Sequence, residues 1–408
     1  MVIKQKARLD VEQVLLHMIL ISMTLIAISY ILFFQEGTSP FWERMILVSR
    51  LMTLLFDVVY LFFLLVAKKQ VDVPSIKVYL ILLYIIVISM LVFCPSFMQV
   101  ISNAFPWPLT YLVFYSYSRK RDIPSSFEKV LVFCYICICL ALVKTIITRF
   151  SASINTGPVY YSISYLPLVL LLCKDKKKIV LSSFATILVV LSAKRTGLLA
   201  LVSGFCIYLI LMINQGHSSK DKFRSILKIA LVGCLIYFIA GHFMDSYLAN
   251  VLNRFRAISE DKGSGRLIIW YLIISQFKQA PIGAKIFGHG FHAVPNFIRP
   301  FGKYIFAHNS YIEFLYDLGI VGAIILLSVV INMGVFLLRL IRDKYEIALP
   351  AAFAFCVILA FSFASYCFEE SNYIMPIAMF WGIIRGYYMK NSKERSIGNQ
   401  VHGDIDNE

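Results

Sequence analysis

The stretch AHNSYIEFLYDLGIVGAIILLSVVINMGVFLL, from Ala307 to Leu338, joins a polar turn to a long apolar segment. Leu318–Leu338 carries no charged residue, and about 20 apolar residues are enough to span the hydrocarbon core of a bilayer. Ser310 and Glu313 match the S-x-x-E capping box, which marks the start of a helix. The stretch therefore predicts a membrane-spanning helix with His308 and Asn309 directly before its N-terminus.

The rest of the chain repeats this apolar pattern. Of its 408 residues 59% are hydrophobic, and the mean hydropathy is +0.77. The sequence predicts an all-α integral membrane protein of about 12 transmembrane helices with one large, partly helical periplasmic loop. We expect about nine spans in 1–244, the loop in 245–317, about three spans in 318–389 and a cytoplasmic tail in 390–408. The apolar runs are 12–34, 45–67, 78–94, 98–117, 130–149, 158–173, 179–193, 196–213, 228–244, 318–338, 351–367 and 373–389.

Positive charges indicate the orientation, because short cytoplasmic loops collect Lys and Arg. Basic residues recur in every second connection, whereas the connections 95–97 and 368–372 contain none. This alternation predicts that the N- and C-termini are both cytoplasmic. The net charge of +16 is then mostly a consequence of topology and does not favour a nucleic-acid partner.

The large loop is basic for a different reason, since long loops escape the positive-inside rule. It contains Arg254, Arg256 and Arg266, and Lys194 and Arg195 stand at another outer turn. Guanidinium groups pair with phosphate oxygens in a two-point geometry, so these residues predict a site for a lipid-linked phosphate or diphosphate. The alternatives are a solvated lid whose charges serve solubility and, at the outer turn, side chains that snorkel to the interface.

His308 is a candidate base. The free N–H groups and the dipole at a helix N-terminus favour an anion and lower the pKa of a nearby histidine, which keeps it neutral. The alternative is a hydrogen-bonding loop histidine. A zinc site of His289, His292 and His308 is a weaker interpretation, because the H-E-x-x-H pattern is missing.

The second apolar run contains two charged residues, Arg50 and Asp57, which share a helix face. Arg50 can snorkel to the outer interface. An acid inside the membrane is a functional candidate, and a pairing of Asp57 with Lys144 is the structural alternative.

Four motifs resemble a known superfamily. His308-Asn309, nine residues, Gly319, two residues and Gly322 resemble the signature of the O-antigen ligases and polymerases. SAKRTG from Ser192, RFRAISEDKGSGRLIIW from Arg254 and FGHGFHAVPN from Phe287 are similar to other segments of that superfamily. The resemblance covers most of 180–330 at the level of motifs.

The resemblance implies a metal-independent, inverting glycosyltransferase that uses an undecaprenyl-diphosphate-linked donor and no cofactor. Carried onto this chain, His308 would activate the acceptor hydroxyl, and Arg266 and Arg195 would bind the diphosphate as catalytic residues. The expected substrate-binding residues are Arg254, Arg256, Asn309 and Lys194.

The resemblance favours a polymerase that transfers an O-antigen or capsule glycan onto a lipid-linked repeat unit at the periplasmic face of the bacterial inner membrane. Its expected partners are the undecaprenyl-diphosphate-linked oligosaccharide, membrane lipids and a chain-length regulator protein. The alternative is an O-antigen ligase, which transfers the glycan to lipid A-core. A transporter of lipid-linked oligosaccharide is disfavoured, because the charges gather at the rim and not at the midplane.

Overall fold

The computed structural model describes residues 10–33, 40–67, 76–91, 97–148, 157–192, 194–215, 265–301 and 305–405. All regular secondary structure in these ranges is helical, which confirms the predicted all-α class. The helices are α1 (Val11–Phe33), α2 (Pro40–Val66), α3 (Ile76–Leu91), α4 (Phe97–Ala104), α5 (Pro106–Ser118), α6 (Ser125–Thr148), α7 (Gly157–Leu172), α8 (Asp175–Leu191), α9 (Arg195–Gln215), α12 (Arg266–Gln279), α13 (Ile282–Phe287), α14 (Ala293–Ile298), the 3₁₀ turn η1 (Arg299–Phe301), α15 (Ser310–Arg342), α16 (Ala348–Ala364) and α17 (Ser371–Ile405).

The helices have the length and the apolar surface of a membrane protein. Among the described helices, 5 are long and apolar enough to cross a bilayer, in α1, α2, α6, α9 and α15, and the shorter α7 and α16 are apolar as well. Large apolar side chains face outward along these helices, as at Phe62, Phe133 and Ile324, where lipid would cover them. The count of about 12 spans stays a prediction, because the run 228–244 lies outside the described residues.

One predicted span is broken. The run 98–117 forms two helices, α4 and α5, which meet at Phe105. Pro106 and Pro108 follow directly, and a proline has no N–H to donate to the preceding turn. Pro106 instead occupies the first turn of α5, where that N–H would have no partner in any case.

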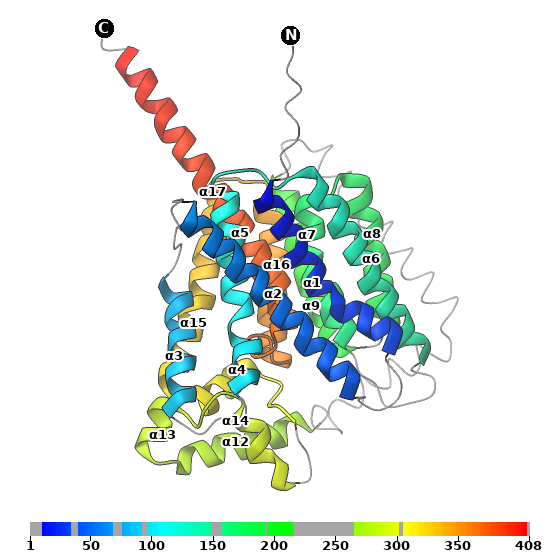
Figure 1. Cartoon of the computed structure of the whole chain (residues 1–408), viewed down its shortest axis with the longest axis vertical. Coiled ribbons are helices and arrows are strands. Elements are labelled where there is room, and N and C mark those ends of the chain that lie inside the picture. Colours follow the sequence, from blue (N-terminus) through cyan, green and yellow to red (C-terminus); the bar gives the residue numbers. More distant parts are fainter. Residues whose placement is uncertain are drawn as a thin grey trace.

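Helices α5, α7 and α17 form the centre of the bundle. Nearly every side chain of α5 and α7 is buried, as expected for helices that are apolar all round and surrounded by others. Helix α17 packs along α5 and also contacts α7. The start of α1 and the end of α17 lie at one end of the bundle, and α12, α13 and α14 lie across the opposite end (Figure 1). The assignment of these ends to the cytoplasm and the periplasm stays a prediction.

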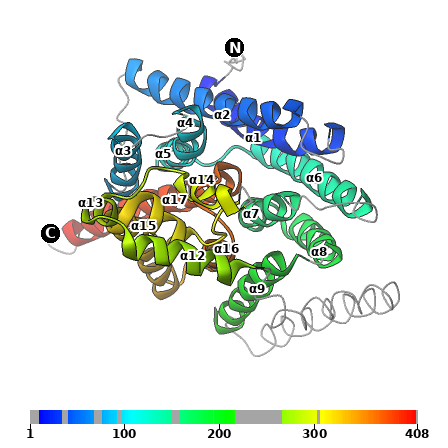
Figure 2. The ribbon, with the colours of Figure 1, turned by 90° about the horizontal axis from the view of Figure 1, so that it is seen from below.

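The described part of the predicted loop is structured. In the view from below, at the end of the bundle where this loop lies, α12 crosses the bundle beside α14, and α13 lies next to α3 (Figure 2). Ile273, Val294, Ile298, Ala307 and Tyr316 form a small core that joins α12, α14 and the start of α15. The opposite face of α12 is apolar and exposed, which suits a helix lying at a membrane interface.

Candidate functional site

The C-terminal end of α16 is the point at which the predicted site segments meet. The last carbonyl groups of a helix have no intrahelical partner. The carbonyl of Ala364 accepts hydrogen bonds from Arg266 Nη1 at 2.7 Å and from Thr196 Oγ1 at 3.3 Å. The carbonyl of Phe363 accepts one from Asn309 Nδ2 at 3.1 Å. The starts of α9, α12 and α15 are therefore held around one helix end, whose partial negative charge favours cations.

Asn309 begins α15. Its side-chain oxygen accepts from the backbone N–H groups of Tyr311 at 3.0 Å and Ile312 at 3.1 Å. The predicted capping box, with Ser310 as the cap, is therefore wrong by one residue. Asparagine is among the best N-cap residues, and the Ser310 hydroxyl is engaged elsewhere.

His308 lies directly before this cap, in the left-handed region of backbone space at φ 54. Its ring centroid lies 5.2 Å from that of Tyr366 in the loop after α16. Burial, and then the positive charges of Arg266 and Lys194, lower the pKa of His308 to about 3. Lys194 and Arg266, which the sequence places far from His308, therefore each lie within electrostatic reach of its imidazole, which is neutral at physiological pH.

Lys194 and Arg195 stand at the start of α9. The Lys194 ammonium lies 5.6 Å from the centre of the Tyr160 ring, a cation–π distance. Arg195 is the first residue of α9 and is partly buried, and the hydroxyl of Thr196 reaches the end of α16. The backbone of Arg195 is therefore part of the same region. Arg254 and Arg256, which the sequence also predicts, lie outside the described residues.

Sequence reasoning missed the acidic pair in the loop between α16 and α17. The Ser310 hydroxyl donates to Glu369 Oε2 at 2.8 Å and accepts from the Cys367 N–H at 2.8 Å. Burial raises the pKa of Glu369 to about 7, and its backbone carbonyl accepts from His292 Nε2 at 3.4 Å. The sequence does contain a sign of this site, because Glu369 and Glu370 are adjacent acids in a short connection that has no basic residue.

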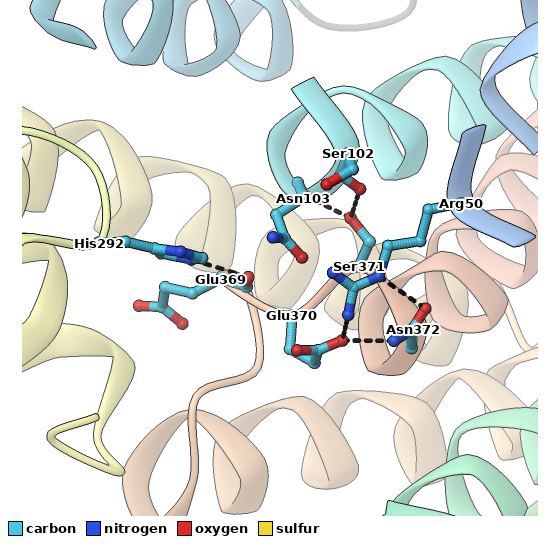
Figure 3. Close-up of polar contacts among 8 residues, drawn as sticks. All are labelled: Arg50, Ser102, Asn103, His292, Glu369, Glu370, Ser371 and Asn372. Atoms are coloured by element: carbon cyan, nitrogen blue, oxygen red, sulfur yellow. Dashed lines mark hydrogen bonds and ion pairs between the residues drawn. The ribbon is translucent and has the colours of Figure 1, made fainter. Parts of the chain in front are cut away.

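The same loop is fixed on its other side by α2. Arg50 forms an ion pair with Glu370, and its Nε donates to Asn372 Oδ1 at 3.1 Å. Figure 3 shows this loop with His292 on one side and Arg50 on the other. The prediction that Arg50 snorkels to the interface is therefore wrong, because Arg50 is buried and its partner is the partly buried carboxylate of Glu370.

The predicted pairing of Asp57 with Lys144 is wrong too. Asp57 Oδ2 accepts from Thr110 Oγ1 at 2.7 Å, and the Lys144 ammonium donates to the carbonyl of Ile31 at 2.5 Å. Each of these groups finds a neutral partner on a neighbouring helix, so neither of them needs the other.

The glycine spacing of the motif reflects a break in α15. Gly319 has φ 68 and ψ −170, which interrupts the helix, and the loop at Gly288 lies directly against the break. The N–H groups of His289 and Gly290 donate to the carbonyl of Asp317 at 3.0 Å and 2.8 Å. The absence of a side chain at Gly319 therefore lets the backbone of this loop approach the helix.

The two histidines of this loop have separate partners. His289 Nδ1 donates to the Tyr316 carbonyl at 3.0 Å, whereas His292 faces Glu369. Within the described ranges, no group of three or more His, Cys, Asp or Glu side chains is arranged to hold a metal ion.

A comparison with known families finds a match in the part of the chain that contains these site residues. Residues 180–327 match the family described as O-antigen ligase. No curated protein shows significant similarity to the chain. The matched residues contain α9, α12 and the first half of α15, together with Lys194, Arg266 and His308. The match confirms the resemblance that the motifs indicate.

Proposed function

We propose that this chain, a member of the O-antigen ligase and polymerase superfamily, transfers a glycan from undecaprenyl diphosphate to an acceptor sugar without a metal ion. The observation that supports this most is the pairing of fixed cations with a neutral base. Burial lowers the pKa of the His308 imidazole to about 3, and the nearby positive charges of Arg266 and Lys194 add to this effect. Such a site combines cations that can bind a diphosphate with a base that can take a proton.

The cations would stabilise the leaving group. When the bond between the anomeric carbon and the diphosphate oxygen breaks, its electron pair remains on the diphosphate. Fixed positive groups stabilise charge that develops in this way. Arg266 is oriented by the Ala364 carbonyl through Nη1, and the rest of its guanidinium makes no hydrogen bond to the described part of the chain. Arginine donors can therefore do here what Mg²⁺ does in other transferases.

His308 would act on the acceptor. The acceptor hydroxyl oxygen attacks the anomeric carbon from the face opposite the diphosphate and loses its proton to the imidazole. One displacement of this kind inverts the configuration at the anomeric carbon. The lowered pKa keeps the imidazole of His308 neutral before the reaction. The negative charge of a bound diphosphate would raise that pKa toward the operating pH, which a general base requires.

We propose polymerisation as the reaction, with the glycan passing to a lipid-linked repeat unit at the periplasmic face. Ligation to lipid A-core is the second candidate, because the matched family is described as O-antigen ligase. A deletion strain distinguishes the two. Loss of a polymerase leaves one repeat unit on the core, whereas loss of a ligase leaves lipid-linked polymer that is not attached.

The transfer itself can be tested with purified protein and a lipid-linked repeat unit. We expect Arg266→Gln to lower the rate by about 10²–10³-fold and His308→Ala by about 10²–10⁴-fold, with transfer unaffected by EDTA. Arg342→Gln is the matched control, because Arg342 is an exposed arginine at the other end of α15. If EDTA stopped turnover, or if His308→Ala retained it, the proposal would be wrong.

A further inference from the structure

The peptide group before His308 is held on both sides. The Ala307 N–H donates to Glu313 Oε2 at 3.1 Å, and the Ala307 carbonyl accepts from Trp270 Nε1 at 2.7 Å. From this geometry we infer that Glu313 and Trp270 are positioning residues, which fix the imidazole of His308 for proton transfer. The inference rests on the proposed function, since it takes His308 to be the base.

The backbone of His308 needs such support. A residue other than glycine at φ 54 occupies a sparsely populated conformation that costs about 1–3 kcal/mol and persists only when its surroundings determine it. Asn309 fixes the following residue by capping α15. Without the two hydrogen bonds to Ala307, the backbone before His308 could relax, and the direction of the imidazole would change.

Glu313 is not required for helix capping. Asn309 already accepts from the N–H groups of Tyr311 and Ile312, whereas Glu313 reaches out of the helix to Ala307. Its side chain is fully buried, and its Oε1 has no hydrogen-bond partner within the described chain. Burying a carboxyl group is costly unless it is hydrogen-bonded, and the bond from the Ala307 N–H is the one hydrogen bond that this side chain makes within the described residues.

Trp270 links the base to a cation. Trp270 and Arg266 lie four residues apart in α12, so they share one face of that helix. Arg266 is fixed to the end of α16, and Trp270 is fixed to the peptide before His308. One rigid helix turn therefore sets the separation between the guanidinium and the imidazole. This gives a physical reason for the spacing of Arg and Trp in the sequence.

Substitutions that keep shape can test these roles. Trp270→Phe keeps the aromatic packing against Phe363 and removes the N–H, and Glu313→Met keeps the volume and removes the acceptor. We expect both to lower kcat about 10–100-fold, because a misplacement of about 1 Å costs that much, with KM for the donor changed by less than about twofold. Glu313→Gln retains an oxygen that can accept from Ala307 and should keep kcat within about threefold of the wild type.

The matched control is Trp381→Phe in α17. The Trp381 Nε1 is buried and makes no hydrogen bond within the described residues, so its loss should leave kcat unchanged. Thermal unfolding of each variant shows whether the fold is kept. If Glu313→Met and Trp270→Phe keep the wild-type kcat, or if Glu313→Gln is as slow as Glu313→Met, the positioning inference is wrong. If His308→Ala itself transfers at the wild-type rate, the proposed function has failed instead.

Discussion

Replacing Gly319 by alanine should be among the most damaging changes that add one methyl group to this chain. Its backbone lies at φ 68 and ψ −170, a region that only glycine adopts readily. A Cβ at this position would overlap the carbonyl group of Ile286 and lie 2.6 Å from the backbone nitrogen of Gly288. Since these are backbone atoms, no change of rotamer can make room. The loop or the helix must move.

The expected loss of stability is the sum of two contributions, the backbone strain and the lost hydrogen bonds. Strain in this conformation costs about 1–3 kcal/mol. Moving the loop away from the break also removes the two hydrogen bonds that the Asp317 carbonyl accepts from His289 and Gly290, each worth about 1 kcal/mol. The free energy of unfolding should therefore fall by about 3–5 kcal/mol, at the upper end of what single substitutions do.

The assay is reversible unfolding of the purified protein in detergent micelles or bicelles. Gly283→Ala is the matched control, because Gly283 lies in α13 with nothing within 4 Å of an added Cβ. This change should be neutral or stabilise by up to about 1 kcal/mol. A Gly319→Ala protein within about 1 kcal/mol of the wild type would refute the close contact between the loop and the break.

Other predictions concern charge and capping. By NMR titration the pKa of His308 should be near 3, and Arg266→Gln should raise it, because a neighbouring positive charge is lost. Since the folded pKa of His308 lies below the usual 6.5, its contribution to stability is complete above pH 6.5 and is lost as the pH falls toward 3. His308→Asn should flatten that part of the stability–pH curve. Arg50→Met should cost about 1–3 kcal/mol, because Glu370 loses its cation and keeps only the hydrogen bond from Asn372, and Arg50→Met with Glu370→Gln should cost clearly less in the same unfolding assay. Asn309→Ala should cost about 0.5–2 kcal/mol, because it removes the N-cap of α15.

The sequence was sufficient to predict the local features of the structure. Apolar runs predicted most of the described helices, because burial in lipid or protein determines such segments. The polar turn before α15 and the helix of the large loop were also visible, since each depends on neighbouring residues. The break of the run 98–117 was missed although Pro106 and Pro108 stood in it. The high hydropathy of this run predicts a single span, although neither proline can donate a backbone hydrogen bond.

The assembly of the site was not visible in the sequence. The contacts that join it connect Arg266 and Thr196 to Ala364 across separations of 98 and 168 residues. Nothing local indicates that these groups will share one carbonyl. The same holds for Glu369, whose role depends on Ser310 at a separation of 59 residues. Motif resemblance indicated Arg266 and His308 as functional residues, but the helix end that brings them together appears only in three dimensions.

We propose that Lys194 and Arg266 bind the diphosphate of the lipid carrier beside His308. The most direct measurement is the affinity of the purified protein for undecaprenyl diphosphate, by native mass spectrometry or by a shift in thermal unfolding. We expect Arg266→Gln and Lys194→Gln each to raise Kd about tenfold or more, His308→Ala to change it less than about threefold, and EDTA to have no effect. Wild-type affinity in Arg266→Gln, or binding that requires a divalent cation, would contradict the account.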